Sequence, residues 1–198
     1  MSHTPTPVPP VKHDWLAALL SYLVPGLGQI HQGRTFKGVL FLVCLYTLFF
    51  YGQALGSWRN VYLPGTQGLP PVHLVDRNDF QGKGWRITLP EGVPTALGYR
   101  PQFLGQFWIG AAAWPALVQY MNYDKAQPRG PIFGNYQRAV EEDQINKMQL
   151  EGDKHWDLGW VYTVIAGALN VLVIYDALAG PAFREPPAAP ERKEPVPT

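Results

Sequence analysis

The chain has 198 residues, a single cysteine and a formal net charge of +1. This charge excludes a global field that would attract nucleic acid or a strongly charged partner, and the lone Cys44 excludes a disulfide within the chain. The length fits one domain or a small helical bundle with appended loops. The apolar residues gather in four uncharged blocks, and the polar residues fill the connections between them.

The first two blocks predict a transmembrane hairpin over residues 14–56, after a Pro- and Thr-rich tail at residues 1–13 that is predicted to be disordered. Pro25 and Gly26 interrupt the first block, "WLAALLSYLVPGLGQI", so its helix is short. The second block, "GVLFLVCLYTLFFYGQALGSW", has the roughly 20 residues of helix that cross a bilayer. A cleaved signal peptide is the alternative for the first block, but no small-residue cleavage site follows it and the next segment is again apolar.

The middle of the chain predicts a loop followed by a third transmembrane helix. Residues 57–101 are punctuated by Pro and Gly around short alternating runs, which predicts an extramembrane loop with a β-hairpin through Asn78 to Gly84. The third block covers residues 102–123. Its length predicts a spanning helix, which Pro115 is expected to kink.

The last part of the chain predicts a polar connection, a fourth transmembrane helix and a second tail. Residues 124–156 are expected to be partly helical, from about Tyr136 to Leu150, because they hold acidic and basic residues four apart. Residues 157–180 form the fourth apolar block. Residues 181–198 are rich in Pro, Glu and Ala, which predicts a disordered, solvated tail.

These patterns predict an all-α integral membrane protein with about four transmembrane helices and a small irregular or β-hairpin loop. Trp and Tyr residues mark the ends of the blocks, as in an interfacial aromatic belt. A soluble helical domain is the alternative, but it would have to bury four such blocks. The expected location is the cell membrane, multi-pass, and the inner membrane if the cell has two. The positive-inside rule places the first and third connections in the cytoplasm and both tails outside.

The stretch "PGLGQIHQGRTFKG" raises the choice between a phosphate-binding loop and a hairpin turn. A phosphate loop needs a preceding strand and a Lys followed by Ser or Thr. Here Gly38 follows Lys37, and a membrane-length run comes next. The pattern therefore favours a hairpin, in which Pro25 and Gly26 end the first helix and Gly33 permits the turn.

The extended stretch "PGLGQIHQGRTFKGVLFL" resembles the signature of the two-transmembrane-helix domain family. The positions that match are Gly26, Gly28, His31, Gly33, Arg34 and Gly38. The spacing from Gly28 to Gly33 is shorter than in the animal members. The Asp-Arg-Phe triplet of some members is absent, so the resemblance implies no receptor-like coupling.

The whole chain resembles an uncharacterised bacterial integral membrane family of unknown function. The resemblance lies in the opening hairpin, in "GSWRNVY" and in the closing "WDLGWVYTVIAGALNVLVIYDALAGP". It implies a membrane location and no assigned activity.

The candidate binding residues are polar side chains in or beside the predicted spans. Asp176 is the first candidate, since carboxylates inside a membrane serve ion pathways or pair with basic residues. The alternative is an interfacial carboxylate that satisfies the backbone or pairs with Arg184. Asn170 lies on a different face of the same predicted helix. The remaining candidates surround the hairpin turn, where they would bind a headgroup or an ion, or hydrogen-bond free carbonyls: Gln29, His31, Gln32 and Arg34.

The sequence predicts no catalytic residue, metal site or cofactor. The pairs His13–Asp14 and His155–Asp157 match no standard metal-ligand spacing. The G-x-S-x-G, H-E-x-x-H and C-x-x-C patterns are absent. Cys44 sits in an apolar run that would keep its thiol protonated and inert.

We therefore expect a non-enzymatic interaction or scaffold protein. Its expected partners are the lipid bilayer and either further copies of the chain or other membrane proteins, with no nucleic acid. The pairs Ala112/Ala116 and Thr163/Gly167 have the small-residue spacing that lets helices pack closely. The alternative is a small transporter or channel subunit that uses polar residues of the third and fourth predicted helices. A membrane-embedded lipid enzyme ranks last, because no acid–base pair is present.

Overall fold

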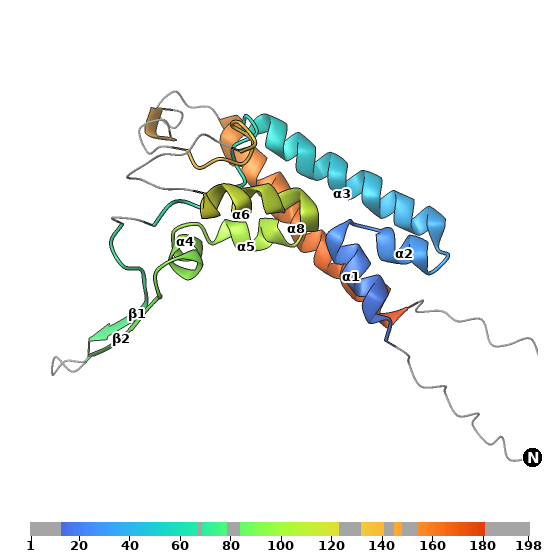
Figure 1. Cartoon of the computed structure of the whole chain (residues 1–198), viewed down its shortest axis with the longest axis horizontal. Coiled ribbons are helices and arrows are strands. Elements are labelled where there is room, and N and C mark those ends of the chain that lie inside the picture. The colour runs from blue at the N-terminus through green and yellow to red at the C-terminus, as the bar shows by residue number, and fades with distance from the viewer. Residues whose placement is uncertain are drawn as a thin grey trace, which may run out of the picture.

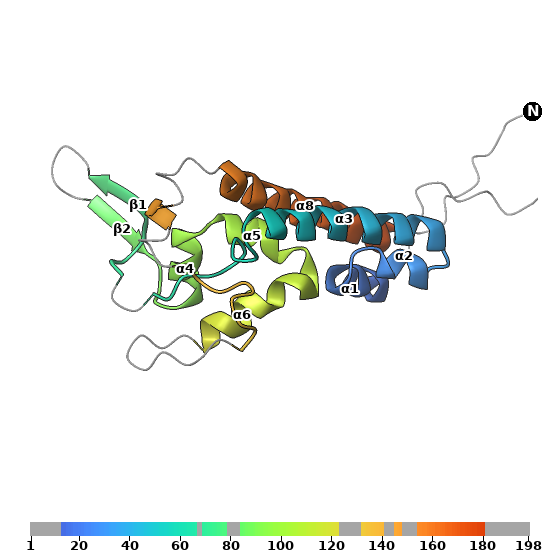
Figure 2. The same cartoon turned by 90° about the horizontal axis from the view of Figure 1, so that it is seen from above.

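Two long antiparallel helices form the frame of the protein. The computed structural model describes residues 13–66, 69–78, 84–122, 132–140, 145–147 and 154–180. In this part of the chain, α3 (Thr35–Leu55) and α8 (Lys154–Ala179) lie side by side along the long axis (Figures 1 and 2). They are also the two helices, among the described residues, that are long and apolar enough to cross a membrane.

The frame helices cross at glycine positions near the end of α3 and the start of α8. A Cβ atom on Gly52 would lie 2.7 Å from the carbonyl oxygen of Gly159, and one on Gly159 would lie 2.7 Å from that of Gly52. The two backbones therefore touch directly, as small residues allow in membrane helix pairs.

The first apolar block forms two short helices that reverse direction. They are α1 (Trp15–Leu23) and α2 (Leu27–His31). Gly26 makes the reversal in a left-handed conformation, with φ of +85°. At the other end of this hairpin, the Gln32 amide donates to Asp14 Oδ2 at 3.2 Å, so the hairpin enters and leaves at one end of the frame. The nine residues of α1 reach about 14 Å, half a bilayer, so the spanning helix predicted here is not formed.

The third apolar block also reverses instead of forming one helix. The predicted helix over residues 102–123 is wrong: the chain forms α5 (Gln102–Phe107), the 3₁₀ helix η1 (Gly110–Ala113) and α6 (Trp114–Met121). After η1, α6 runs back toward the end where α5 begins (Figures 1 and 2). Gly110 makes the turn with φ of +85°, at a place where a Cβ atom would lie 1.8 Å from the carbonyl oxygen of Tyr22.

Pro115 lies in the first turn of α6 and does not merely kink a longer helix. The break leaves backbone groups that Gln137, from a distant turn, satisfies. The Gln137 side chain accepts from the Ala116 N–H at 2.9 Å and donates to the Ala112 carbonyl at 2.6 Å. A sequence window cannot reveal this partner, because it lies more than twenty residues away.

The remaining elements lie at the end of the frame where α3 stops. A two-stranded antiparallel sheet joins β1 (His73–Asn78) to β2 (Gly84–Thr88), where the sequence predicts a hairpin, and α4 (Val93–Tyr99) follows. The helix predicted over residues 136–150 is wrong at its start, because residues 138–140 are not helical. Within the rest of that range, residues 145–147 form a helical turn and the others lie outside the described residues, as do residues 1–12 and 181–198.

The described chain thus has two long helices and two half-length hairpins in place of about four spanning helices. The α1–α2 hairpin enters from the end where α8 stops, since the Asp14 N–H donates to the Leu178 carbonyl at 3.1 Å. The α5–α6 hairpin enters from the opposite end. Their tips meet where Gly110 contacts Tyr22. The turn at Gly33 and residues 132–140 lie at opposite ends of the frame, since the Gln137 N–H donates to the Trp58 carbonyl at 2.7 Å, just beyond the end of α3. The predicted membrane side of each connection stays a prediction.

Candidate functional site

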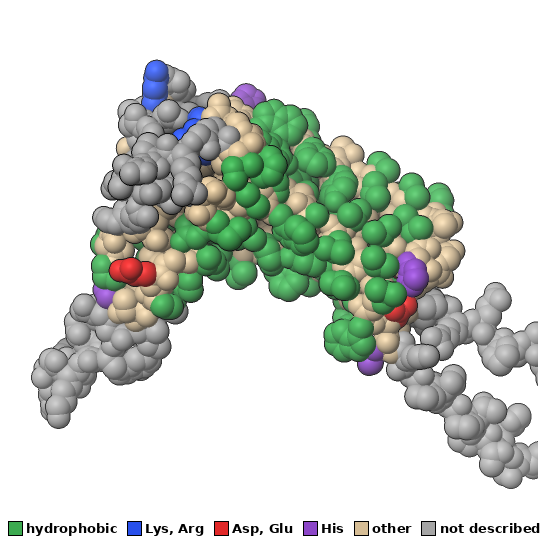
Figure 3. Space-filling model, viewed as in Figure 1, with side chains coloured by type: hydrophobic (Ala, Val, Ile, Leu, Met, Phe, Trp, Pro, Cys, Tyr) green, Lys and Arg blue, Asp and Glu red, His purple; other side chains and the backbone are tan. Residues whose placement is uncertain are grey.

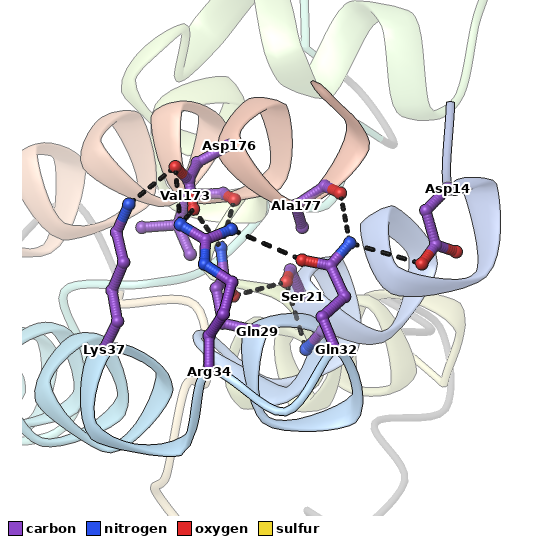
Figure 4. Close-up of polar contacts among 10 residues, drawn as sticks. Asp14, Ser21, Gln29, Gln32, Arg34, Lys37, Val173, Asp176 and Ala177 are labelled. Atoms are coloured by element: carbon purple, nitrogen blue, oxygen red, sulfur yellow. Dashed lines mark hydrogen bonds and ion pairs between the residues drawn. The ribbon is translucent and has the colours of Figure 1, made fainter. Parts of the chain in front are cut away.

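The opening motif and the end of α8 form one polar cluster around Asp176, which we call the Asp176 lock (Figure 4). Lys37 Nζ lies 2.6 Å from Asp176 Oδ1, and Arg34 Nη2 lies 2.8 Å from Asp176 Oδ2. Gln29 Nε2 donates to the same Oδ2 at 3.1 Å. The carboxylate is 23 % exposed, and three side chains from one short segment bind it. Its charge is more than balanced by the two cations.

Gln29 is the most deeply buried part of the lock. Its amide also donates to the Val173 carbonyl at 2.8 Å, and its Oε1 accepts from Ser21 Oγ at 3.0 Å. Ser21 Oγ in turn accepts from the Gly28 N–H at 3.2 Å. These bonds use both ends of the amide, which explains how Gln29 is fully buried without an unpaired polar atom.

Gln32 and Asp14 extend the lock to the last carbonyls of α8. Gln32 Nε2 donates to the Ala177 carbonyl at 2.7 Å and to Asp14 Oδ2 at 3.2 Å. The other oxygen of Asp14 accepts from the Ala17 N–H at 3.0 Å and caps α1. The Ala17 N–H, followed by the Gln32 amide, lowers the pKa of Asp14. The opening hairpin therefore supplies the donors that the C-terminus of α8 lacks within its own helix.

Four of the six predicted site residues come together in the lock, namely Gln29, Gln32, Arg34 and Asp176. His31 is exposed, and it lowers the pKa of Asp14 less than the Ala17 N–H and the Gln32 amide do. Asn170 lies elsewhere, at the junction of the two hairpins. Its Nδ2 donates to the Trp108 carbonyl at 2.8 Å and to the Ser21 carbonyl at 3.1 Å.

Sequence reasoning missed Ser21 and Lys37 as members of the lock. Ser21 gives no signal, since it stands in an apolar run. Gln32 follows Gln29 by three residues, a spacing that places both side chains on one side of a helical turn. The predicted alternative partner of Asp176, Arg184, lies outside the described residues.

The Asp176 carboxylate has no free oxygen atom with which to bind a metal ion. Both carboxylate oxygens of Asp176 accept from protein donors. Within the part of the chain that the structure describes, no group of three or more His, Cys, Asp or Glu side chains could hold a metal ion. The arrangement is a charge-assisted clasp between two segments about 140 residues apart in the sequence.

The fold and the lock define a class: a helical protein framed by two apolar helices of membrane-spanning length, with a half-length hairpin clasped to one of them. The chain belongs to a family of unknown function, DUF6677, whose model matches residues 16–190. Neither the curated proteins nor the solved structures contain a match. The unknown function of the family agrees with the resemblance drawn from the sequence. The bacterial source and the membrane nature of the family stay predictions.

Proposed function

We propose that this protein is a multi-pass membrane protein that acts without catalysis, by interaction with other membrane components. Only 28 % of the most apolar window of α3 and 33 % of that of α8 is buried inside the chain, whereas a core helix of a soluble protein is mostly buried. Figure 3 shows hydrophobic side chains over the middle of one face, with charged and histidine side chains toward its two ends. A lipid or protein environment would cover these apolar surfaces.

The observation that supports the non-enzymatic proposal is that the ionisable side chains of the Asp176 lock are held in ion pairs. Arg34 and Lys37 both bind Asp176, and these two ion pairs hold the opening hairpin in place. A group that is held in this way supports a rigid structure and is not positioned to exchange protons with a substrate. The apolar outer stripe of α3, which includes Phe36, Val39 and Val43, is the surface we propose for contact with another membrane protein or a further copy.

Photo-crosslinking in native membranes tests this proposal. A photoreactive residue in place of Val43, on the outer stripe of α3, is expected to give one defined protein adduct. The same residue in place of Leu172, on the outer face of α8, is the matched control for lipid exposure. Identification of the adduct by mass spectrometry decides between a second copy and another protein. Adducts with lipid alone from both positions would count against the interaction role.

The two-span arrangement predicts which positions share a side of the membrane. Reporter fusions at His13 and at the C-terminus are expected on one side, and fusions at Gly65 and Gly134 on the other. The reason is that each half-length hairpin returns to the end where it enters. Paired reporters that are active on opposite sides of a membrane measure this directly. If His13 and Gly65 report the same side, the opening hairpin spans twice and the four-span arrangement is restored.

A small transporter or channel subunit is the second candidate, and one observation favours it. Asn170 Oδ1 is buried at the junction of the two half-length hairpins, and no described residue hydrogen-bonds to it. Transporters bind substrates and ions where interrupted helices meet inside the membrane. A solute flux in proteoliposomes that Asn170→Ala abolishes, without loss of folded protein, would move the proposal to this candidate.

A further inference from the structure

A second buried polar cluster lies where α3 ends and α5 begins, and we call it the Asn60 cluster: Asn60, Arg100, Gln106 and Thr163. Arg100 Nη2 and Gln106 Nε2 both donate to the Asn60 carbonyl, each at 3.2 Å. Gln106 Nε2 also lies 2.8 Å from Thr163 Oγ1. Asn60 Nδ2 donates to the Gly52 carbonyl at 2.8 Å. These bonds join Asn60 to Arg100, which precedes α5, and to Gln106 in α5. Gln106 extends the cluster to Thr163 in α8.

Three polar atoms of the Asn60 cluster have no hydrogen-bond partner among the residues that the structure describes. They are Arg100 Nε, Asn60 Oδ1 and Gln106 Oε1. Asn60 and Gln106 are fully buried, and Arg100 is 9 % exposed. Leaving a buried polar group unpaired costs about 1–3 kcal/mol, and native proteins pair nearly all such groups. The cluster therefore contains one charged donor and two amide acceptors that are buried without a hydrogen bond in the described part of the chain.

The charge of Arg100 points to an anion. Its guanidinium lies 3.8 Å from the centre of the Tyr62 ring, and within the described residues no carboxylate forms an ion pair with it. Burial lowers the pKa of Arg100, and the neighbouring Tyr62 opposes this shift. A buried cation without a counter-charge is unfavourable, because its desolvation is not compensated.

We infer that the Asn60 cluster binds a phosphate ester whose alcohol part carries free hydroxyl groups, as in a glycerol phosphate. Arg100 Nε–H donates to a phosphate oxygen, a pairing for which the guanidinium is well suited. The two amide oxygens, Asn60 Oδ1 and Gln106 Oε1, accept from hydroxyl groups. Asn60 follows shortly after the end of α3 at Leu55, the level at which lipid headgroups meet a spanning helix. A phosphatidylglycerol headgroup and free glycerol phosphate carry the same groups.

Native mass spectrometry of the full chain in nanodiscs tests the inference. With phosphatidylcholine in excess over phosphatidylglycerol, the wild-type chain is expected to retain phosphatidylglycerol. Arg100→Lys keeps the charge but removes Nε–H, and we expect it to weaken retention about tenfold. Arg59→Lys is the matched control: Arg59 lies next to Asn60 in the sequence, and its Nη2 donates to Asn135 Oδ1 at 3.1 Å. We expect this control to retain the lipid as the wild type does.

Two further arms separate the sources and guard against a misfolded variant. Binding of soluble glycerol phosphate without a preference for phosphatidylglycerol would support a soluble ligand. The wild-type chain is expected to retain phosphatidylglycerol better than phosphatidylethanol, an anionic lipid whose headgroup has no free hydroxyl. Equal retention of these two lipids would overturn the hydroxyl contacts. Retention of neither anion, or equal loss in Arg100→Lys and Arg59→Lys, would overturn the site.

Discussion

Gly26→Ala is expected to destabilise the protein by more than about 4 kcal/mol, because two independent constraints meet at this residue. Its φ of +85° lies in the left-handed region, which costs an alanine about 1–2 kcal/mol. In addition, a Cβ atom would lie 2.0 Å from the carbonyl oxygen of Gly38, at the start of α3. Neither backbone segment can give way without separating α2 from α3. Thermal unfolding in detergent, followed by tryptophan fluorescence, measures the loss.

Gly33→Ala is the matched control for Gly26→Ala. Gly33 has nearly the same φ, +80°, but a Cβ atom there meets nothing within 4 Å. Its expected cost is therefore the conformational cost alone, about 1–2 kcal/mol. The difference between the two variants isolates the close approach of the hairpin to α3. Equal destabilisation by both would show that backbone conformation alone accounts for Gly26.

Asp176→Asn is expected to loosen the opening hairpin and to destabilise the protein by about 1–3 kcal/mol. The asparagine can still accept hydrogen bonds, but Arg34 and Lys37 lose their counter-charge. Hydrogen exchange measured by mass spectrometry is expected to quicken in residues 25–38, which carry the donors of the lock. The strands β1 and β2 lie at the far end and are expected to exchange as in the wild type.

Asp157→Asn removes a charge from the same helix, in its exposed first turn, and serves as the control. It is expected to leave the exchange of residues 25–38 unchanged. The double variant Arg34→Gln/Asp176→Asn adds a test of coupling, since removing Arg34 costs less when Asp176 is already neutral. Strict additivity of the two changes would contradict a direct pairing within the lock.

The sequence predicts the two long helices of the frame because the length and composition of one continuous segment are enough to predict a helix. The second and fourth blocks hold the uninterrupted apolar runs that form α3 and α8. The two hairpins depend instead on contacts between distant segments. Gly110 turns the third block because the end of α1 comes against it, and Gln137 satisfies the backbone at the break. An apolar block has the same composition whether it forms one continuous helix or two short helices that reverse direction.

The candidate site divides in the same way. Asp176 is conspicuous because it is a charge at the end of an apolar run, and Gln29 and Arg34 are conspicuous because they are polar residues in a glycine-rich turn. Their mutual contact is not encoded in local spacing, since they lie on segments 142 and 147 residues apart. Asn170, a candidate predicted on a different helical face from Asp176, binds carbonyls at the hairpin tips, a role that only the three-dimensional arrangement reveals.

The separation of the two halves of the Asp176 lock fixes an order of events during synthesis. Residues 25–38 leave the ribosome long before α8 exists, and at about 5–20 residues per second the delay is on the order of ten seconds. During this interval the half-length hairpin lacks the carboxylate that later neutralises Arg34 and Lys37. In the proposed membrane arrangement, those two cations stay at the membrane surface until α8 arrives. The helix α8 is thus the element that closes the opening hairpin.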